Sequence, residues 1–312
     1  MKKKLLFTCV MMSVLCFFSY SQAAQQFNWA AAGIGGTYYP MSVGMSKIIN
    51  KYVPNVKITI EVTGGGVANS RLVGSGDNDF GISNSNSCYF AIKGQKPFKK
   101  KYKMYSIAYL YPSSLHTVVM AKSPIKSFKD FKGKRIAIGP AGGGTINTFR
   151  DLIPFYGFQE KDFKLSFISF SDGVKALKDG NAEINMVIAG APAGAAKELA
   201  ETADVRFISV EDDKLKQLMG KYDYYVRSEL PKSMFNTSED IVTIGLGNLW
   251  IVRDNMPEET VYQMTKAVFE HLDDLGKAHP QGKNVSLKTA TSVSIPLHPG
   301  AIKYYKEKGI IK

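Results

Sequence analysis

Cysteine is scarce in this sequence of 312 residues: three are present, and two of them lie within the first 23 residues. If that segment is removed, Cys88 alone remains, which excludes an internal disulfide. A single cysteine in an apolar stretch is more often a small core residue than a nucleophile, so we expect Cys88 to be structural. The four histidines are scattered without ligand spacing, and we therefore expect neither a metal site nor a cofactor.

Long apolar runs are absent beyond the first 23 residues, which argues against a later transmembrane helix. The N-terminal segment itself has three lysines, an apolar run from Leu5 to Phe18, and small residues at Ser21 and Ala23. These features predict a cleavable signal peptide over residues 1–23. The mature protein should be exported, and it should be periplasmic in a Gram-negative cell.

The chain also lacks an arginine-rich stripe, although its formal net charge is +13. Basic residues are spread along the sequence, and the run that contains Lys99, Lys100, Lys101 and Lys103 is typical of a solvated loop. We therefore expect no nucleic-acid partner. The positive charge instead favours long-range attraction of small anions.

Familiar catalytic motifs are missing as well. Gly139 and Gly144 have the glycine spacing of a nucleotide-binding P-loop, but Thr145 stands where that motif needs lysine. No G-x-S-x-G or H-E-x-x-H sequence is present. A periplasmic hydrolase stays open as a weaker alternative, because catalytic triads assemble only in space.

Strand-like and helix-like segments alternate along the mature chain, which predicts an α/β fold with parallel sheets. A chain of about 290 residues exceeds one usual core, so we expect two lobes. Predicted strands cover residues 27–32, 56–62, 79–83, 104–111, 116–121, 135–139, 165–170, 184–189, 205–210 and 240–253. Predicted helices cover 41–52, a segment through 71–72, one opened by Thr145, 174–178, one from Pro192, 258–275 and 300–308.

Three residues that often carry function are expected to be structural here. Trp29 and Trp250 fall within predicted strands, and His298 lies in a proline-flanked loop before the last helix. We expect the two indoles in the core and the imidazole in a capping or packing role.

Glycine-rich turns follow several of the predicted strands. Gly142, Gly143 and Gly144 separate one strand from an amphipathic helix that starts at Thr145. Backbone N–H groups and the positive end of the helix dipole make such a turn an anion site. Comparable turns occupy residues 35–37, 64–66, 84–86 and 189–192. Because the carboxyl ends of parallel strands share one edge of a sheet, we expect these turns to meet at one cleft.

Four segments resemble the TAXI-type solute receptors of TRAP (tripartite ATP-independent periplasmic) transporters. They are GIGGTYYPMSVGMSKIINK, EVTGGGVANSRLVGSGDNDFGISNSNSCYFA, IAIGPAGGGT and IPLHPGAIKYYKEKGI. The resemblance implies a type II-like periplasmic binding protein whose two α/β lobes are joined by crossing strands. Lobe I would hold residues 24–118 and 248–312, and lobe II residues 119–247.

The same resemblance implies a function without catalysis. The receptor would capture a small carboxylate similar to 2-oxoglutarate or glutamate, with four to six carbons. It would deliver this organic acid anion to the membrane subunits of a TRAP permease, and we expect it to act as a monomer. A binding fold that feeds a sensor kinase instead of a permease stays open.

The resemblance further implies a set of ligand-binding residues shared by the lobes. They are Gly36, Thr37, Tyr38, Gly65, Gly66, Asn84, Ser85 and Asn86 in lobe I, and Gly143, Gly144, Thr145, Gly190 and Pro192 in lobe II. The family often has Gln-Ser-Asp where this chain has Asn84-Ser85-Asn86, so a carboxylate suited to an ammonium group is missing. This departure favours an oxo- or hydroxy-acid over an amino acid.

Overall fold

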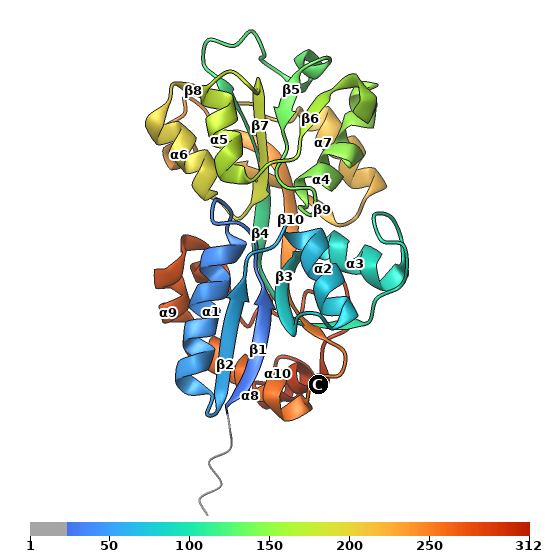
Figure 1. Ribbon diagram of the computed structural model, residues 1–312, viewed down its shortest axis with the longest axis vertical. Helices are drawn as coiled ribbons and strands as arrows, with labels where there is room; N and C mark the ends of the chain where they lie inside the picture. Colours follow the sequence, from blue (N-terminus) through green and yellow to red (C-terminus); the bar gives the residue numbers. More distant parts are fainter. Residues whose placement is uncertain (1–23) are drawn as a thin grey trace, which may run out of the picture.

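The computed structural model describes residues 24–312, and the predicted signal peptide lies outside them. Its helices and strands form two lobes, and two long strands run through both (Figure 1). These strands are β4 (Met104–Met120) and β10 (Ile241–Arg253). They pair antiparallel with each other, so the lobes are joined by neighbouring strands of one sheet.

Lobe I is the lower half of Figure 1 and contains the first three strands and the C-terminal helices. The strand order is β2-β1-β3-β10-β4, in which β1 is parallel to β2 and β3, whereas β10 is antiparallel to β3. Its elements are β1 (Gln25–Ala30), α1 (Tyr38–Tyr52), β2 (Val56–Glu61), α2 (Gly66–Ser75), β3 (Phe80–Asn84), α3 (Ser85–Lys93), α8 (Glu258–Glu270), α9 (Leu272–Ala278), the short helix η5 (Pro280–Asn284) and α10 (Pro299–Glu307).

Lobe II repeats the same strand-to-helix alternation in the upper half of Figure 1. Its strand order is β4-β7-β5-β6, with β5 parallel to β6 and β7, while β8 and β9 pair with β4 and β10. Its elements are β5 (Arg135–Ala137), α4 (Thr145–Leu152), β6 (Lys164–Ser166), α5 (Phe170–Lys178), β7 (Ile184–Ala189), α6 (Gly194–Thr202), β8 (Val205–Phe207), α7 (Asp212–Lys221) and β9 (Tyr225–Leu230). Short 3-10 helices η1 (Phe128–Phe131), η2 (Ile153–Tyr156), η3 (Glu160–Asp162) and η4 (Lys232–Met234) connect them.

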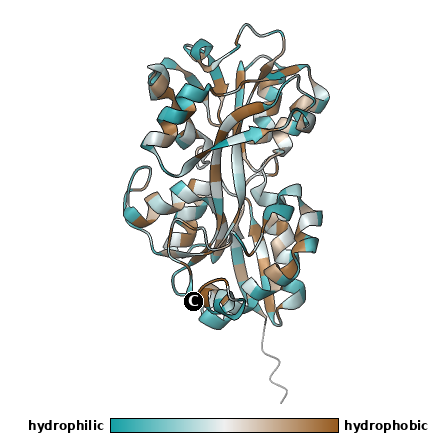
Figure 2. Ribbon diagram, turned by 180° about the vertical axis from the view of Figure 1, so that it is seen from behind, coloured by the Kyte–Doolittle hydropathy of each residue, from teal (hydrophilic) through white to brown (hydrophobic). Residues whose placement is uncertain are grey.

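Burial explains why these segments become strands. Every residue of β3 and of β7 is buried, as expected for strands covered by helices on both faces. In Figure 2 apolar residues mark the central strands, whereas the outer helix faces carry much of the hydrophilic colour. Among residues 24–312, no helix has the length and apolar character needed to cross a bilayer.

The four residues expected to have structural roles, Trp29, Trp250, His298 and Cys88, do have them. Trp29 and Trp250 are fully buried and stack with their ring centroids 5.5 Å apart in the core of lobe I. His298 caps α10, because its Nδ1 accepts a hydrogen bond from the Gly300 N–H at 3.1 Å. Cys88 is buried, and burial raises the pKa of its thiol to about 12, which keeps the sulfur protonated.

Several predicted boundaries were wrong. The segments 104–111 and 116–121 form one strand, because Ser113 and Ser114 pair with β10 rather than forming a turn. The segment 165–170 is a strand only to Ser166, and Phe170 already begins α5. The segment 258–275 is two helices that meet at His271, and α3, α7 and β9 were not predicted.

The predicted lobe boundaries fall inside the two crossing strands. The boundary at 118/119 lies near the end of β4, and the boundary at 247/248 lies in the middle of β10. The exact division of the chain stays a prediction, since each of these strands contributes residues to both lobes.

Replacement of Trp29 by alanine should lower the free energy of unfolding by about 3–5 kcal/mol, because the change removes a large buried side chain and leaves a cavity. Urea denaturation followed by circular dichroism measures the difference. Val226→Ala is the control, since Val226 is 52% exposed and its truncation should change stability by roughly 0.5 kcal/mol or less. Equal stability of the two variants would contradict this assignment of the core.

Candidate functional site

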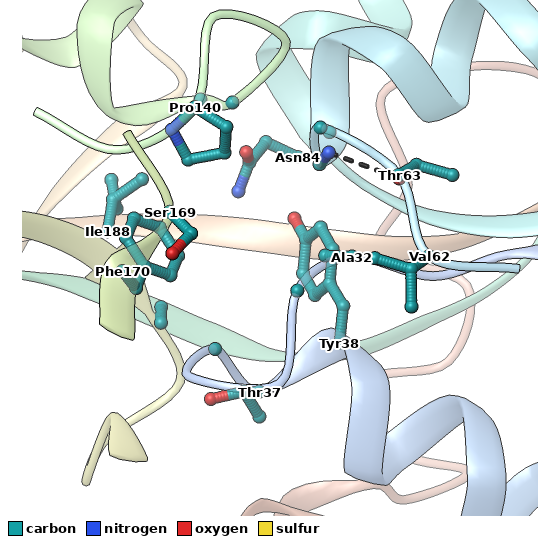
Figure 3. Close-up of a pocket in the computed structure, with 18 residues that line it drawn as sticks. Ala32, Thr37, Tyr38, Val62, Thr63, Asn84, Pro140, Ser169, Phe170 and Ile188 are labelled. Carbon is teal, nitrogen blue, oxygen red and sulfur yellow. Dashed lines mark hydrogen bonds between the residues drawn. The ribbon is translucent and has the colours of Figure 1, made fainter. Parts of the chain in front are cut away.

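A cavity of about 140 Å³ lies between the lobes, where the strand-to-helix connections of both face each other (Figure 3). Lobe I contributes the β1–α1 and β2–α2 connections and the end of β3, and lobe II contributes the β5–α4 and β6–α5 connections and the end of β7. The lining residues are Ala32, Gly33, Gly36, Thr37, Tyr38, Val62, Thr63, Gly64, Gly65, Gly66, Asn84, Pro140, Gly143, Gly144, Ser169, Phe170, Ile188 and Ala189. None of these side chains carries a formal charge.

Five helices begin at the wall of this cavity. α1 begins at Tyr38 and α2 at Gly66, while Asn84, Gly144 and Ser169 are the N-cap residues of α3, α4 and α5. The first N–H groups of a helix have no acceptor within it, and the helix dipole adds partial positive charge there. The cavity therefore favours an anion although its wall has no cationic side chain.

Glycine allows the backbones of the two lobes to meet beside the cavity. A Cβ atom at Gly64 would lie 3.0 Å from the Cα of Gly142, and one at Gly144 would overlap Oδ1 of Asn84. Gly65 has φ +107°, a conformation that L side chains rarely adopt, and it is the N-cap of α2. These glycines therefore serve close approach as well as the helix starts.

An amide on crossing strand β10 holds the lobe I side of the cavity. Oδ1 of Asn248 accepts hydrogen bonds from Tyr38 Oη at 2.7 Å, Asn84 Nδ2 at 3.0 Å and Ser113 Oγ at 3.2 Å. Its Nδ2 donates to the carbonyl of Tyr111 at 2.9 Å. Burial raises the pKa of Tyr38 well above its usual range, and nearby Tyr111 adds to this, so the phenol stays protonated and donates.

Hydrogen bonds also connect the lobes directly, from donors and acceptors in lobe I to backbone groups of lobe II. Such hydrogen bonds contribute about 0.5–1.5 kcal/mol each to the stability of the arrangement. The pairs are Thr37 Oγ1 with Gly190 O (2.8 Å), Ala68 N with Gly142 O (3.0 Å), Ala195 N with Gly35 O (3.1 Å) and Gln281 Nε2 with Ala191 O (2.5 Å). The structure therefore represents the closed arrangement of the lobes.

The structure brings eight of the thirteen predicted ligand-binding residues to the cavity wall. These eight are Gly36, Thr37, Tyr38, Gly65, Gly66, Asn84, Gly143 and Gly144. They come from both lobes, as the sequence analysis expected. Their contact with a ligand stays a prediction.

The other five predicted residues are not part of the wall, and four of them make hydrogen bonds within the protein instead. The Thr145 hydroxyl accepts from the Ile188 N–H at 3.1 Å, and the Gly190 carbonyl accepts from Thr37 across the lobes. The carbonyl of Ser85 accepts from Ser294 Oγ at 2.7 Å, and Asn86 Oδ1 accepts from the N–H of the next residue. The peptide bond between Ala191 and Pro192 is cis.

Sequence reasoning missed several wall residues. Ser169 and Phe170 were assigned to a strand, whereas they form the start of α5. Val62 directly follows β2 and Ile188 lies within β7, and neither belongs to a motif. Asn248, which does not line the cavity but bonds to Tyr38 and Asn84 of its wall, is a single amide within β10. The polar Asn248 in a mostly buried strand was one available signal, because a buried amide needs partners. The Ser169-x-x-Asp172 spacing, typical of a helix N-terminus, was another.

Within residues 24–312, no group of three or more His, Cys, Asp or Glu side chains is placed to bind a metal ion. His116, which is fully buried on β4, lies away from the cavity wall. Burial lowers the pKa of His116 to about 4, so the ring is neutral near pH 7.

Gly64→Leu should hold the lobes apart, because a side chain at this position must occupy the seam against the Gly142 backbone. Small-angle scattering should give a larger radius of gyration for the variant than for the wild type. Gly220→Leu is the matched control, since a Cβ at Gly220 meets nothing within 4 Å. Scattering curves that coincide for all three proteins would show that the seam does not govern closure.

Comparisons with known proteins agree with this architecture. The alkanesulfonate-binding protein SsuA from Xanthomonas axonopodis pv. citri, bound to MOPS, matches with a TM-score of 0.53 at 14% identity, covering 92% of this chain and 91% of that chain. A putative L-cystine ABC transporter protein from Listeria monocytogenes matches with a TM-score of 0.52 at 15% identity, covering 84% and 98%. At such identities the likeness is one of fold, and it confirms the expected two-lobed α/β binding-protein fold.

The family assignment comes from the sequence itself. The model of the NMT1-like family matches residues 29–309, which include both lobes and the two crossing strands. The chain therefore belongs to the NMT1-like family.

Proposed function

We propose that this protein is an exported solute receptor that captures a small carboxylate of four to six carbons and delivers it to a TRAP permease. The convergence of five helix starts on a cavity shared by both lobes carries the proposal. Such backbone donors stabilise an anion without a charged partner. A cavity of this size suits a small acid, since an apolar cavity of roughly 150 Å³ holds a benzene-sized molecule.

Binding without chemical conversion fits the cavity wall. Its eighteen lining residues include no histidine, cysteine or acidic side chain that would act as a general base. Cys88, the single cysteine of the described residues, is fully buried with a pKa of about 12. A receptor needs only placed donors and a hinge, and β4 and β10 provide the connection between the lobes.

Export and the transport partner rest on the sequence. The segment 1–23 has the pattern of a cleavable signal peptide, which supports a periplasmic location. The TAXI resemblance over nearly the whole mature chain supports a TRAP permease as the partner. One of the solved structures named above is a putative L-cystine ABC transporter protein, but a shared fold alone does not select the permease.

A charge placed at one helix start tests the anion site. In the wild type the Asp172 N–H donates to Ser169 Oγ at 3.1 Å. Ser169→Asp keeps a good N-cap acceptor for this N–H but adds a negative charge at the wall. It should weaken 2-oxoglutarate or 4-methyl-2-oxopentanoate binding in calorimetry by about tenfold or more. Ser169→Asn, the neutral control, should retain most of the affinity. Equal affinities of the two variants would exclude an anion at this wall.

The energy source for uptake tests the permease. In cells that express this protein, deletion of its gene should abolish high-affinity uptake of the radiolabelled acid that binds the purified protein. Ionophores that collapse ion gradients should stop this uptake at constant cellular ATP. Uptake that follows ATP and ignores the gradients would assign the receptor to an ABC system instead.

A further inference from the structure

We propose that the cargo is a monocarboxylate with a small apolar body, rather than a dicarboxylate or an amino acid. This inference rests on the proposed function, because it specifies the ligand of the same cavity. It goes against the 2-oxoglutarate and glutamate that the sequence resemblance implies. Three properties of the cavity wall carry it.

The first property is the lack of ionic partners. None of the eighteen lining side chains is acidic, so an ammonium group would enter without a counter-charge. None is basic either, so a second carboxylate would have no Arg or Lys to pair with. A charge taken out of water without such a partner is strongly disfavoured.

The second property is that the wall hydroxyls have already placed their protons. A hydroxyl has one proton to donate. Thr63 Oγ1 lies 2.5 Å from Asn69 Oδ1 and 3.2 Å from the Ala31 carbonyl, and Ser169 Oγ donates to Asp172 Oδ2 at 2.7 Å.

Two further wall hydroxyls are engaged in the same way. Thr37 donates to the Gly190 carbonyl at 2.8 Å, and Tyr38 donates to Asn248 at 2.7 Å. The four hydroxyls thus offer a ligand mainly their lone pairs, which repel a carboxylate. Donors for an anion come from the N–H groups at the helix starts and from Asn84. One Nδ2 hydrogen of Asn84 is donated to Asn248, and the other is free to be donated to a ligand.

The third property is the apolar surface that remains. Pro140, Phe170 and Ile188 of lobe II face Tyr38 across the cavity in Figure 3, and Val62 lies on the lobe I side. Burial of hydrocarbon against such side chains contributes about 25 cal/mol per Å². The wall therefore favours the binding of a ligand that has a hydrocarbon body and a single carboxylate.

A matched set of three compounds tests this assignment by calorimetry on the purified mature protein. 4-Methyl-2-oxopentanoate has one carboxylate and a branched apolar end, 2-oxoglutarate has a second carboxylate there, and leucine replaces the oxo group with ammonium. We expect 4-methyl-2-oxopentanoate to bind about tenfold or more tightly than either other compound.

The outcomes separate the two levels of the proposal. If 2-oxoglutarate or leucine binds as tightly as 4-methyl-2-oxopentanoate, the apolar monocarboxylate is wrong, and the carboxylate receptor stands. If none of the three binds, both the monocarboxylate assignment and the proposed carboxylate receptor are wrong.

A charge at the apolar wall should reverse the preference. Val62 lines the cavity and is 65% exposed, so Val62→Lys adds an ammonium group without disturbing a core. It should tighten 2-oxoglutarate and weaken 4-methyl-2-oxopentanoate, each by about fivefold. Val226→Lys, at a 52% exposed valine on β9 outside the wall, should change neither affinity. An unchanged preference in Val62→Lys would overturn the placement of the apolar body.

Discussion

The direction of the strands is the constraint on which the site depends. Parallel strands that alternate with helices must start each helix at the carboxyl edge of the sheet. Both lobes obey this rule, and β4 and β10 join them so that the two carboxyl edges face each other. Five helix starts consequently share one small cavity. The electrostatic character of the cavity is thus a property of backbone direction, and it needs no charged side chain.

Close contact between the lobes is the second requirement, and small residues provide it. Gly64 and Gly142 bring two backbones together, while the amide of Asn84 lies between Gly66 and Gly144. A side chain at Gly64, Gly142 or Gly144 would have to displace a group of the other lobe. The three consecutive glycines at residues 142–144 therefore have a packing reason, and two of them, Gly143 and Gly144, also line the cavity.

Much of this arrangement could be predicted from the sequence. The glycine turns after predicted strands identified part of the wall, including Gly36, Gly65 and Gly144, because a strand, a turn and a helix start leave a clear local pattern. Ser169 escaped this reasoning, since the apolar sequence from Leu165 to Phe170 has the pattern of a strand although the chain turns after Ser166. Val62 and Ile188 could not be found, because cavity exposure depends on the other lobe. Gly190 carried a turn signal, but its carbonyl is used between the lobes.

The direct bonds between the lobes have a kinetic consequence for the cargo. The hydrogen bonds of Thr37 with Gly190 and of Gln281 with Ala191 hold the two lobes together close to the cavity. A bound solute would leave only after these bonds break, so opening of the lobes adds a barrier to release beyond the contacts that the solute itself makes. A membrane partner that binds the lobes in their separated state would then speed the release of the solute.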